Sequence, residues 1–390
     1  MTSIYLDNAA TTRMHAGVSA EMERANRELF YNSAALYGPS LAVKNEIERA
    51  ADTIKRRLSC AVEPDCAKKV CNATFAAQRA TGGTDQLVFT SGATESNNLV
   101  IMGKITRQNH HLIVSAGEHS SVHAPAKFLF DKGHAVDFCP LSGDGTIDLK
   151  ALERLVRPET ALVVFGMVNS DTGCIQDTGA IVRTVRKANR TAHIHCDATQ
   201  GFCKFDLDAA ALGLDSVAIS AHKLGGPKGI GALWMRQKAR LSPLMHGGGQ
   251  QDIRPGTMDT PSILGFARAV ELFDTAEHLE HVSHLHKCLV GNLPPSCKIN
   301  GKNDNPYITN IQLPGILGQT IMNALSSEGI CVGLGSACAS TATKNRTLLA
   351  MGIPEPKTKQ VIRISFCPEN TGNDVKTFIE KLHIAIDKFR

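Results

Sequence analysis

The chain has 390 residues, of which 43% are hydrophobic and 20% charged, the composition of an ordinary globular protein. Its length predicts a full hydrophobic core divided between two closely joined domains. The formal charge of +5 is small and forms no long basic run, which argues against a dedicated nucleic-acid binder. The longest strongly apolar run, residues 161–168, is too short to span a bilayer, so we expect no membrane association.

Twelve cysteines are scattered along the chain, and the first residues enter fold-like sequence without a secretory segment. This usage predicts reduced thiols in a reducing compartment, which we take to be the cytoplasm. The irregular stretch 60–85 holds three of the cysteines and is interpreted as an exposed insertion or long loop. It contains no C-x-x-C pair, so we expect no metal site.

The first predicted elements are a short strand within residues 4–12 and an amphipathic helix over residues 42–58. The strand runs into a turn of small residues, where backbone could approach a ligand. Asn8 in this turn could offer its side-chain amide to a carboxylate.

A candidate anion site follows the strand predicted at residues 86–90. Residues 91–98 contain a glycine turn and precede an apolar helix marked by Leu99, Val100 and Ile101. Free backbone amides and the helix dipole favour a phosphate at such a helix start, and the Thr94 hydroxyl adds a donor. A plain helix cap is the structural alternative.

Three further candidates each follow a predicted strand. His119 comes after residues 110–115, Asn169 after residues 161–165, and Asp197 after residues 192–195. Alternating strands and helices predict a largely parallel, doubly wound α/β sheet, in which the carboxyl ends of the strands share one ligand-binding edge. There His119 could stack on an aromatic cofactor and move protons, although a histidine packed at a strand end is the structural alternative.

Asp197 and Lys223 together suit a pyridoxal 5′-phosphate site. Lys223 lies 26 positions after Asp197, and each of the two follows a short predicted strand, at residues 216–219 and 192–195 respectively. This cofactor needs a lysine to hold its aldehyde as a Schiff base and a carboxylate to keep its ring nitrogen protonated. Taken alone, the pair could also be a surface lysine beside a loop aspartate.

The C-terminal third predicts a smaller α/β region. A helix over residues 261–276 is expected to link the domains, and the small domain to begin near Leu285 and close with an amphipathic helix. Four histidines at positions 278, 281, 284 and 286 read as a solvated helix face rather than a metal site. Cys338 lies in a loop of glycines and serines typical of an accessible thiol. Arg363 lies on a strand and is the residue type that grips a carboxylate.

With these residues in hand, the chain resembles the class V, fold-type I pyridoxal phosphate enzymes, specifically the cysteine desulfurase and selenocysteine lyase group. The resemblance covers nearly the whole chain. It implies a large cofactor-binding domain at residues 15–258 and a small domain at residues 259–390, with residues 1–14 packing near the small domain. The motifs that carry it are Tyr5-Leu-Asp-Asn-Ala-Ala-Thr-Thr12, Thr90-Ser-Gly-Ala-Thr-Glu-Ser-Asn-Asn98, Glu118-His119, Asp197-Ala-Thr-Gln200, His222-Lys223, Gly247-Gly-Gly-Gln250, Arg254-Pro-Gly-Thr257 and Gly335-Ser-Ala-Cys338.

The resemblance also implies a role for each candidate residue. Lys223 would be the Schiff-base lysine, with Asp197 on the ring nitrogen, Gln200 on the ring oxygen and His119 stacked on the ring. The phosphate would be bound by Ala93, Thr94, Ser220 and His222, with Thr257 reaching it from the other subunit of a homodimer. The substrate carboxylate would be bound by Arg363, Asn8 and Asn169. Cys338 would accept the sulfur.

The expected activity is conversion of cysteine to alanine, with the sulfur passing to Cys338 as a persulfide and then to an acceptor protein. The spacing from Cys338 to Arg363 is similar to that of the desulfurases of iron–sulfur cluster assembly. A selenocysteine lyase remains open, because residues 254–257 and 260–265 are similar to that branch. A catalytically degraded paralogue serving as a scaffold or sulfur-carrier partner is a lesser alternative, and a plain aminotransferase would have no need of a thiol loop.

Overall fold

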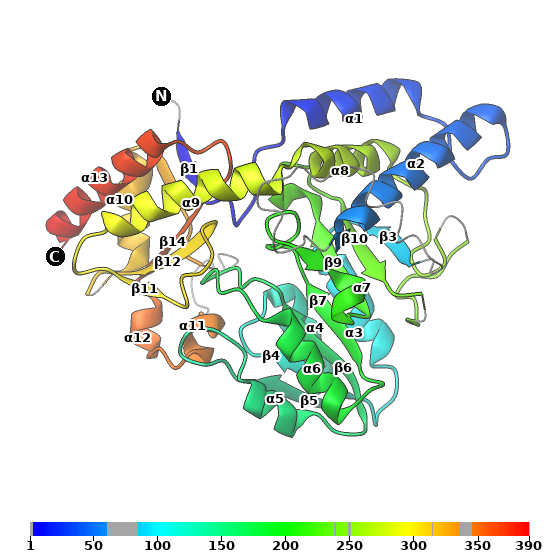
Figure 1. Ribbon diagram of the computed structural model, residues 1–390, viewed down its shortest axis with the longest axis horizontal. Coiled ribbons are helices and arrows are strands. Elements are labelled where there is room, and N and C mark those ends of the chain that lie inside the picture. Colours follow the sequence, from blue (N-terminus) through cyan, green and yellow to red (C-terminus); the bar gives the residue numbers. More distant parts are fainter. Residues whose placement is uncertain are drawn as a thin grey trace.

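The structure is a computed structural model that describes residues 3–60, 85–237, 239–248, 251–313, 315–335 and 345–389. A seven-stranded sheet forms the centre of its larger part (Figure 1). The strands lie in the order β3-β10-β9-β7-β6-β4-β5. Their bounds are β3 Gln86–Thr90, β4 His111–Ser115, β5 Ala135–Cys139, β6 Thr160–Gly166, β7 His193–Asp197, β9 Ser216–Ser220 and β10 Gly231–Met235.

Only one strand of this sheet runs against the others. β10 pairs antiparallel with both β3 and β9, whereas β9, β7, β6, β4 and β5 pair in parallel. This confirms the predicted mostly parallel α/β fold. The carboxyl ends of β3, β4, β6, β7 and β9 therefore share one edge of the sheet, where ligands bind in such folds.

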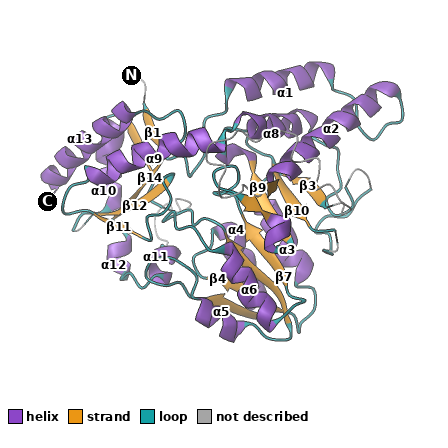
Figure 2. Ribbon diagram, viewed as in Figure 1, coloured by secondary structure: helices purple, strands orange, loops and turns teal. Residues whose placement is uncertain are grey.

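Helices cover both faces of this sheet, so the side chains on both faces of its strands are mostly buried and apolar. On β6, Leu162 and Val164 belong to a hydrophobic cluster with α3 and α4, whereas Val163 and Phe165 belong to a cluster on the other face. Successive side chains of a strand point to opposite faces, which explains this alternation. Figure 2 shows the helices flanking the sheet. Those of the large part are α1 Ala16–Glu28, α2 Gly38–Arg57, α3 Ala93–Lys104, α4 Ser120–Asp131, α5 Leu149–Leu155, α6 Thr178–Ala188, α7 Ala209–Leu212 and α8 Thr260–Leu272, with the short strands β2 Ser59–Cys60 and β8 Leu207–Asp208.

The smaller part is built on a three-stranded antiparallel sheet in the order β11-β12-β14. The N-terminal strand β1 joins this part, because it pairs in parallel with β13 and Asp7 bridges to Ser365. The elements are β1 Ile4–Leu6, α9 Thr275–Gly291, β11 Lys298–Asn300, β12 Ile308–Gln312, α10 Gly318–Ser327, β13 Ile330–Val332, α11 Arg346–Ala350, α12 Glu355–Thr358, β14 Val361–Ser365 and α13 Gly372–Phe389.

Two helices, α8 and α9, take the place of the single helix expected to link the domains, and they pack against different parts of the molecule. α8 packs on α1 and α2 in the large part, whereas α9 packs on α13 in the small part. Figure 1 shows α9 extending from the end of α8 toward the small sheet. We therefore propose that the domain boundary lies at the turn between α8 and α9, later than the predicted 258/259 division.

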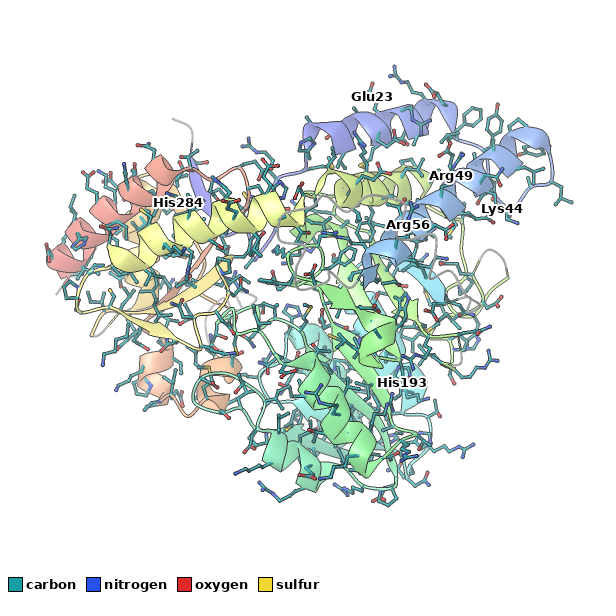
Figure 3. All side chains as sticks on the ribbon, viewed as in Figure 1. Glu23, Lys44, Arg49, Arg56, His193 and His284 are labelled. Atoms are coloured by element: carbon teal, nitrogen blue, oxygen red, sulfur yellow. The ribbon has the colours of Figure 1, made fainter. Side chains whose placement is uncertain are left out.

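The structure can be compared with other predictions made from the sequence. The helix expected over residues 42–58 is α2, and the proposed insertion falls almost entirely on residues 61–84, outside the described part of the chain. On α9, His284 is exposed (Figure 3), and no group of described residues gathers the ligands that a metal ion would need. No described helix is long and apolar enough to cross a membrane.

Candidate active site

The N-terminal segment holds the turn that carries Lys223. Lys223 ends a short 3₁₀ turn, Ala221–Lys223, directly after β9. Its Nζ donates to the carbonyl oxygens of Ala9 (2.5 Å) and Ala10 (2.6 Å). The backbone amide and hydroxyl of Thr12 both donate to the carbonyl of residue 222, so a chain segment more than 200 residues away fixes the lysine.

The surroundings of Lys223 favour its neutral amine. Burial lowers the pKa of Lys223 to about 7, and the nearby cations Arg363 and Lys204 act in the same direction. A buried ammonium loses hydration and is repelled by like charges, which explains both effects. A large fraction of the side chain is therefore nucleophilic at neutral pH, as a lysine that attacks an aldehyde requires.

Asp197 is held as a hydrogen-bonded carboxylate at the end of β7. Its Oδ2 accepts from Nδ2 of Asn97 (2.7 Å), and its Oδ1 accepts from the backbone amide of Thr199 (3.0 Å). The Oδ1 of Asn97 faces Nε2 of His195 at 2.9 Å. The two oxygens of this carboxylate are therefore each held by a donor from the chain.

Two buried histidines continue this network behind Asp197. Nδ1 of His195 and Nε2 of His193 both lie within hydrogen-bonding distance of the Ser216 hydroxyl, at 2.8 and 2.7 Å. His193 lies on β7 inside the large part (Figure 3). Burial lowers the pKa of each to about 3, so both are neutral at physiological pH. The network therefore adds hydrogen bonds around Asp197 without adding a competing charge.

His119 caps α4, and this role fixes its tautomer. The backbone amide of Ser121 donates to Nδ1 of His119 (3.1 Å), and the Ser121 hydroxyl lies 2.9 Å from the same nitrogen. An amide can only donate, so Nδ1 is the acceptor and Nε2 carries the proton. Surrounding protein lowers the pKa of His119 by desolvation, although the ring keeps an exposed face. His119 thus presents a neutral ring with an N–H donor.

His119 and Asp197 are connected through two side chains. The Nδ2 group of Asn97 donates to the Ser121 hydroxyl (2.9 Å) as well as to Asp197. Asn97 is fully buried on α3 and Ser121 lies in the first turn of α4. The two helices therefore fix the relative placement of the imidazole and the carboxylate.

The start of α3 meets the end of β9 as the anion-site prediction requires. Gly92 is the N-cap of α3 with φ of +153°, and no side chain caps this helix. Any Cβ on Gly231 would lie 2.7 Å from Cα of Gly92, so glycine at 231 permits the close approach. The amides at Ala93 and Thr94 thus lie beside Ser220, whose Oγ is 4.0 Å from a Cβ built on Gly92.

Gln200 and His222 also lie at this edge of the sheet. Gln200 is buried, and its Nε2 donates to the Ala9 carbonyl (2.8 Å), the same oxygen that Lys223 contacts. Its Oε1 is buried with no partner among the described residues. Nδ1 of His222 lies 3.1 Å from the Thr11 hydroxyl.

Arg363 is buried and paired within the chain. Its guanidinium donates to Oδ1 of Asp7 (2.7 Å) and to the carbonyl of Ser170 (2.8 Å). Gly333 leaves room for this pair, because a Cβ there would lie 2.5 Å from Oδ1 of Asp7. The Nε of Arg363 is buried without a partner among the described residues.

The two asparagines expected beside Arg363 support backbone in this structure. The Nδ2 of Asn8 donates to the Ser365 carbonyl (2.9 Å) and to Oδ1 of Asn370 (3.2 Å). Oδ1 of Asn169 accepts from the backbone amides of Asp171 and Thr172, which closes a tight turn after β6. A substrate-binding role for either asparagine stays a prediction.

Of the predicted residues that the structure describes, Thr257 is not part of this assembly. Thr257 lies exposed on the loop before α8, and the neighbouring Arg254 pairs with Glu95 on α3 at 2.9 Å. Cys338 falls in residues 336–344, outside the described part of the chain. The predicted roles of both residues stay predictions.

The residues present fit pyridoxal phosphate. The site combines a lysine that is neutral near pH 7, a hydrogen-bonded carboxylate, an imidazole with an exposed face and an uncapped helix start for an anion. The unpartnered Oε1 of Gln200 leaves one buried polar group still to be satisfied.

Several residues that build the site escape sequence reasoning. Asn97 and Ser121 join Asp197 to His119, and Asp7 pairs with Arg363 from 356 residues away. The resemblance motifs contain Asn97 and Asp7, but the sequence does not show which way a helical side chain faces. Ser121 carried a weak signal, since a serine two residues after a histidine suits a helix start.

Comparisons with known proteins agree with this geometry. The family model described as aminotransferase class-V matches residues 4–378. The cysteine desulfurase IscS 1 of Archaeoglobus fulgidus is 31% identical over 397 residues, covering 99% of this chain and 97% of that protein. A solved NifS-like protein superposes with a TM-score of 0.86 at 30% identity, over 99% of this chain and 100% of that one. A structure of SspA in complex with cysteine has a TM-score of 0.78 at 30% identity, over 94% and 99% of the two chains.

Proposed function

Because the chain belongs to the aminotransferase class-V family, whose cofactor is pyridoxal 5′-phosphate, we propose that it is a cysteine desulfurase. Its reaction would convert cysteine to alanine and pass the sulfur to Cys338. The observation that carries the proposal is the assembly of Lys223, Asp197 and His119 at one sheet edge, on a chain that aligns end to end with relatives named for this activity.

Each residue has a place in the proposed reaction. Lys223, Asp197, His119 and the start of α3 would hold the cofactor, which when bound supplies an electron-withdrawing ring that stabilises charge at the substrate α-carbon. Arg363 would bind the substrate carboxylate in exchange for part of its pairing with Asp7. Lys223, with its lowered pKa, would take up the α-proton as a general base.

Sulfur transfer would then fall to Cys338. Its thiolate would attack the substrate sulfur, so that an S–S bond forms while the C–S bond of the substrate breaks. The electron pair of the broken bond stays with the substrate carbon, which is protonated to give alanine. The sulfur remains on Cys338 as a persulfide, ready for an acceptor protein or thiol.

Steady-state turnover with cysteine and with selenocysteine tests the proposal. The expected result is stoichiometric alanine and sulfide from cysteine in the presence of a reductant, with cofactor-dependent kcat/KM. A kcat/KM for selenocysteine at least about 100-fold higher, with little sulfur release from cysteine, would instead assign a selenocysteine lyase, a discrimination of about 2.7 kcal/mol. Absence of both activities in cofactor-loaded protein would leave only the scaffold alternative.

The lowered pKa of Lys223 makes a prediction about cofactor capture. Only the neutral amine attacks the cofactor aldehyde, so the capture rate should rise with pH and level off above the pKa of about 7. Mixing cofactor-free protein with pyridoxal phosphate across neutral pH and following visible absorbance measures this midpoint. Arg363→Met should move the midpoint upward, because it removes a cation that lowers the pKa. A rate still rising tenfold per unit near pH 9 would match an ordinary lysine, whose pKa is about 10.4.

We propose that the protein works as a homodimer. Exposed apolar side chains gather around the turn between α1 and α2, at the end of the molecule opposite the small part (Figure 1). Such residues favour a protein interface. The loop carrying Thr257 is also exposed, as a residue that completes a partner's site must be. The exposed fractions are Phe30 70%, Leu36 90%, Tyr37 55% and Leu41 45%.

Light scattering tests the dimer. The wild-type chain should have twice the mass of one chain, and Leu36→Glu should shift it toward one chain mass because a charge would be buried at the interface. Ile384→Glu on α13 is the matched control, since Ile384 is 54% exposed and lies in the other part of the molecule. A wild-type monomer at micromolar concentration, or equal effects of the two substitutions, would contradict this assignment.

We propose a reducing compartment such as the cytoplasm. Four cysteines, Cys139, Cys174, Cys196 and Cys203, are buried as free thiols, which suits thiols that are never oxidised. A desulfurase also needs a reduced acceptor for its persulfide, which such a compartment supplies. Comparing free thiols with and without reductant in protein isolated under alkylating conditions would test it.

A further inference from the structure

A cavity lies beside Lys223, at the seam between the two parts of the molecule. It has a volume of about 40 Å³ and is lined by residues that include Thr12, Lys204, Lys223, Phe273, Tyr307 and Cys367. Lys223 is the only predicted cofactor residue in its lining. The cavity therefore borders the active-site lysine but is separate from the sheet edge that holds Asp197 and His119.

Lys204 supplies to this cavity a buried charge with no hydrogen-bonding or ionic partner among the described residues. It is only 4% exposed, and its Nζ lies 5.3 Å from the ring centre of Tyr307. Within the described residues it forms no hydrogen bond and no ion pair. The residue before it, Cys203, has φ of +63°, a rare conformation for a non-glycine residue and one that is retained where the surrounding structure requires it.

The polar groups around the cavity are rich in donors and in positive charge. The hydroxyl of Tyr307 is buried with no partner among the described residues. Lys204, Lys223 and Arg13 line the cavity, against the one carboxylate of Glu369. A buried cation is costly unless it is paired, so this lining calls for an acceptor that carries negative charge.

Size and wall chemistry narrow the ligand class. About 40 Å³ exceeds the roughly 10–15 Å³ that one water needs, but it leaves little room for a bulky multivalent anion. Aromatic and apolar walls from Phe273, Phe366 and Leu272 disfavour a strongly hydrated ion. We propose that this cavity binds a small, weakly hydrated monovalent anion, held by the Lys204 ammonium and the Tyr307 hydroxyl.

The charge state of Lys204 is compatible with this role. Burial lowers its pKa to about 8, so most of the side chain is still an ammonium at neutral pH. An anion on Lys204 would screen one of the two cations that lower the pKa of Lys223. It would also join the segment after β7 to Tyr307 in the small part.

Bromide is the probe for the test. Crystals of the cofactor-loaded enzyme soaked in sodium bromide should show a bromine anomalous peak in contact with Nζ of Lys204. The peak should be absent in Lys204→Met and retained in Lys132→Met, because Lys132 lies over Phe128 at 5.6 Å in an exposed setting. Tyr307→Phe removes only the hydroxyl and should weaken the peak. It tests the same site in case Lys204→Met does not fold.

A solution measurement gives the second readout. At constant ionic strength, replacing fluoride with bromide should raise the Tm of the wild type and of Lys132→Met relative to that of Lys204→Met, since a ligand of the native state stabilises it, whereas the general effect of the salt acts on all three proteins alike. Water density alone at Lys204 in bromide-soaked wild-type crystals, or equal bromide dependence of Tm in all three proteins, would overturn the proposal.

Discussion

Lys223→Met is expected to lower alanine formation from cysteine by at least about 10⁴-fold, the upper range for loss of a general base, because the same side chain also tethers the cofactor. Methionine keeps the buried stem and removes only the amine that contacts the carbonyls of Ala9 and Ala10. The variant should still bind the cofactor through the start of α3 and Asp197, but reversibly, so that dialysis removes it.

The matched control for this substitution is Lys228→Met. Lys228 is exposed five positions later on the same loop and should tolerate the change. Turnover, visible absorbance after dialysis and circular dichroism of the three proteins separate chemistry from folding. A Lys223→Met enzyme with activity within tenfold of the wild type would exclude Lys223 as tether and base.

Cys338→Ala is expected to reduce sulfide release from cysteine by at least about 10³-fold, the scale on which loss of a covalent nucleophile acts. The visible absorbance of the bound cofactor should be unchanged, because no cofactor-binding role is expected for this cysteine. Selenocysteine turnover should fall less, since a selenol leaves more readily than a thiol.

Cys331→Ala is the internal control. Cys331 lies half-buried on β13, opposite Tyr5 of β1, in the segment that leads to residue 338. It should retain most activity, and mass spectrometry after a single turnover should find the added sulfur on residue 338 in both the wild type and this variant. Undiminished sulfide release by Cys338→Ala, or sulfur found on residue 331, would refute the assigned role of Cys338.

Strand ends made much of the site predictable from the sequence. Short runs that contain β-branched residues precede His119, Asp197 and Ser220 and mark strands, and the parallel order of β4, β7 and β9 brings their carboxyl ends to one edge. The placement of these residues at one edge therefore follows from local patterns and the topology rules of α/β sheets.

The connections between those residues depend on tertiary packing. Asn97 reaches Asp197 only because α3 turns that face toward β7. The helix is polar in its first half and apolar in its second, so its sequence does not identify the face. The pairing of Asp7 with Arg363 depends on β1 joining the small part across the length of the chain. Local sequence contains no signal for either contact.

The burial of Lys204 is likewise not visible in the sequence. From the sequence it is one cation among 42 lysines and arginines, in the segment Gly201-Phe-Cys-Lys-Phe205 after Asp197. Only the fold places it under Tyr307 and beside Lys223, where its charge acts on the amine. Electrostatic tuning of the active-site lysine is therefore a property of the assembled domains.

Borohydride reduction followed by peptide mapping tests the central claim most directly. Reduction fixes the cofactor to the amine that holds it, and a modified Lys223 resists trypsin, so the label should appear on the peptide spanning residues 205–228. The account predicts one pyridoxyl group per chain on Lys223. A label on another lysine, or no label in protein saturated with cofactor, would contradict it.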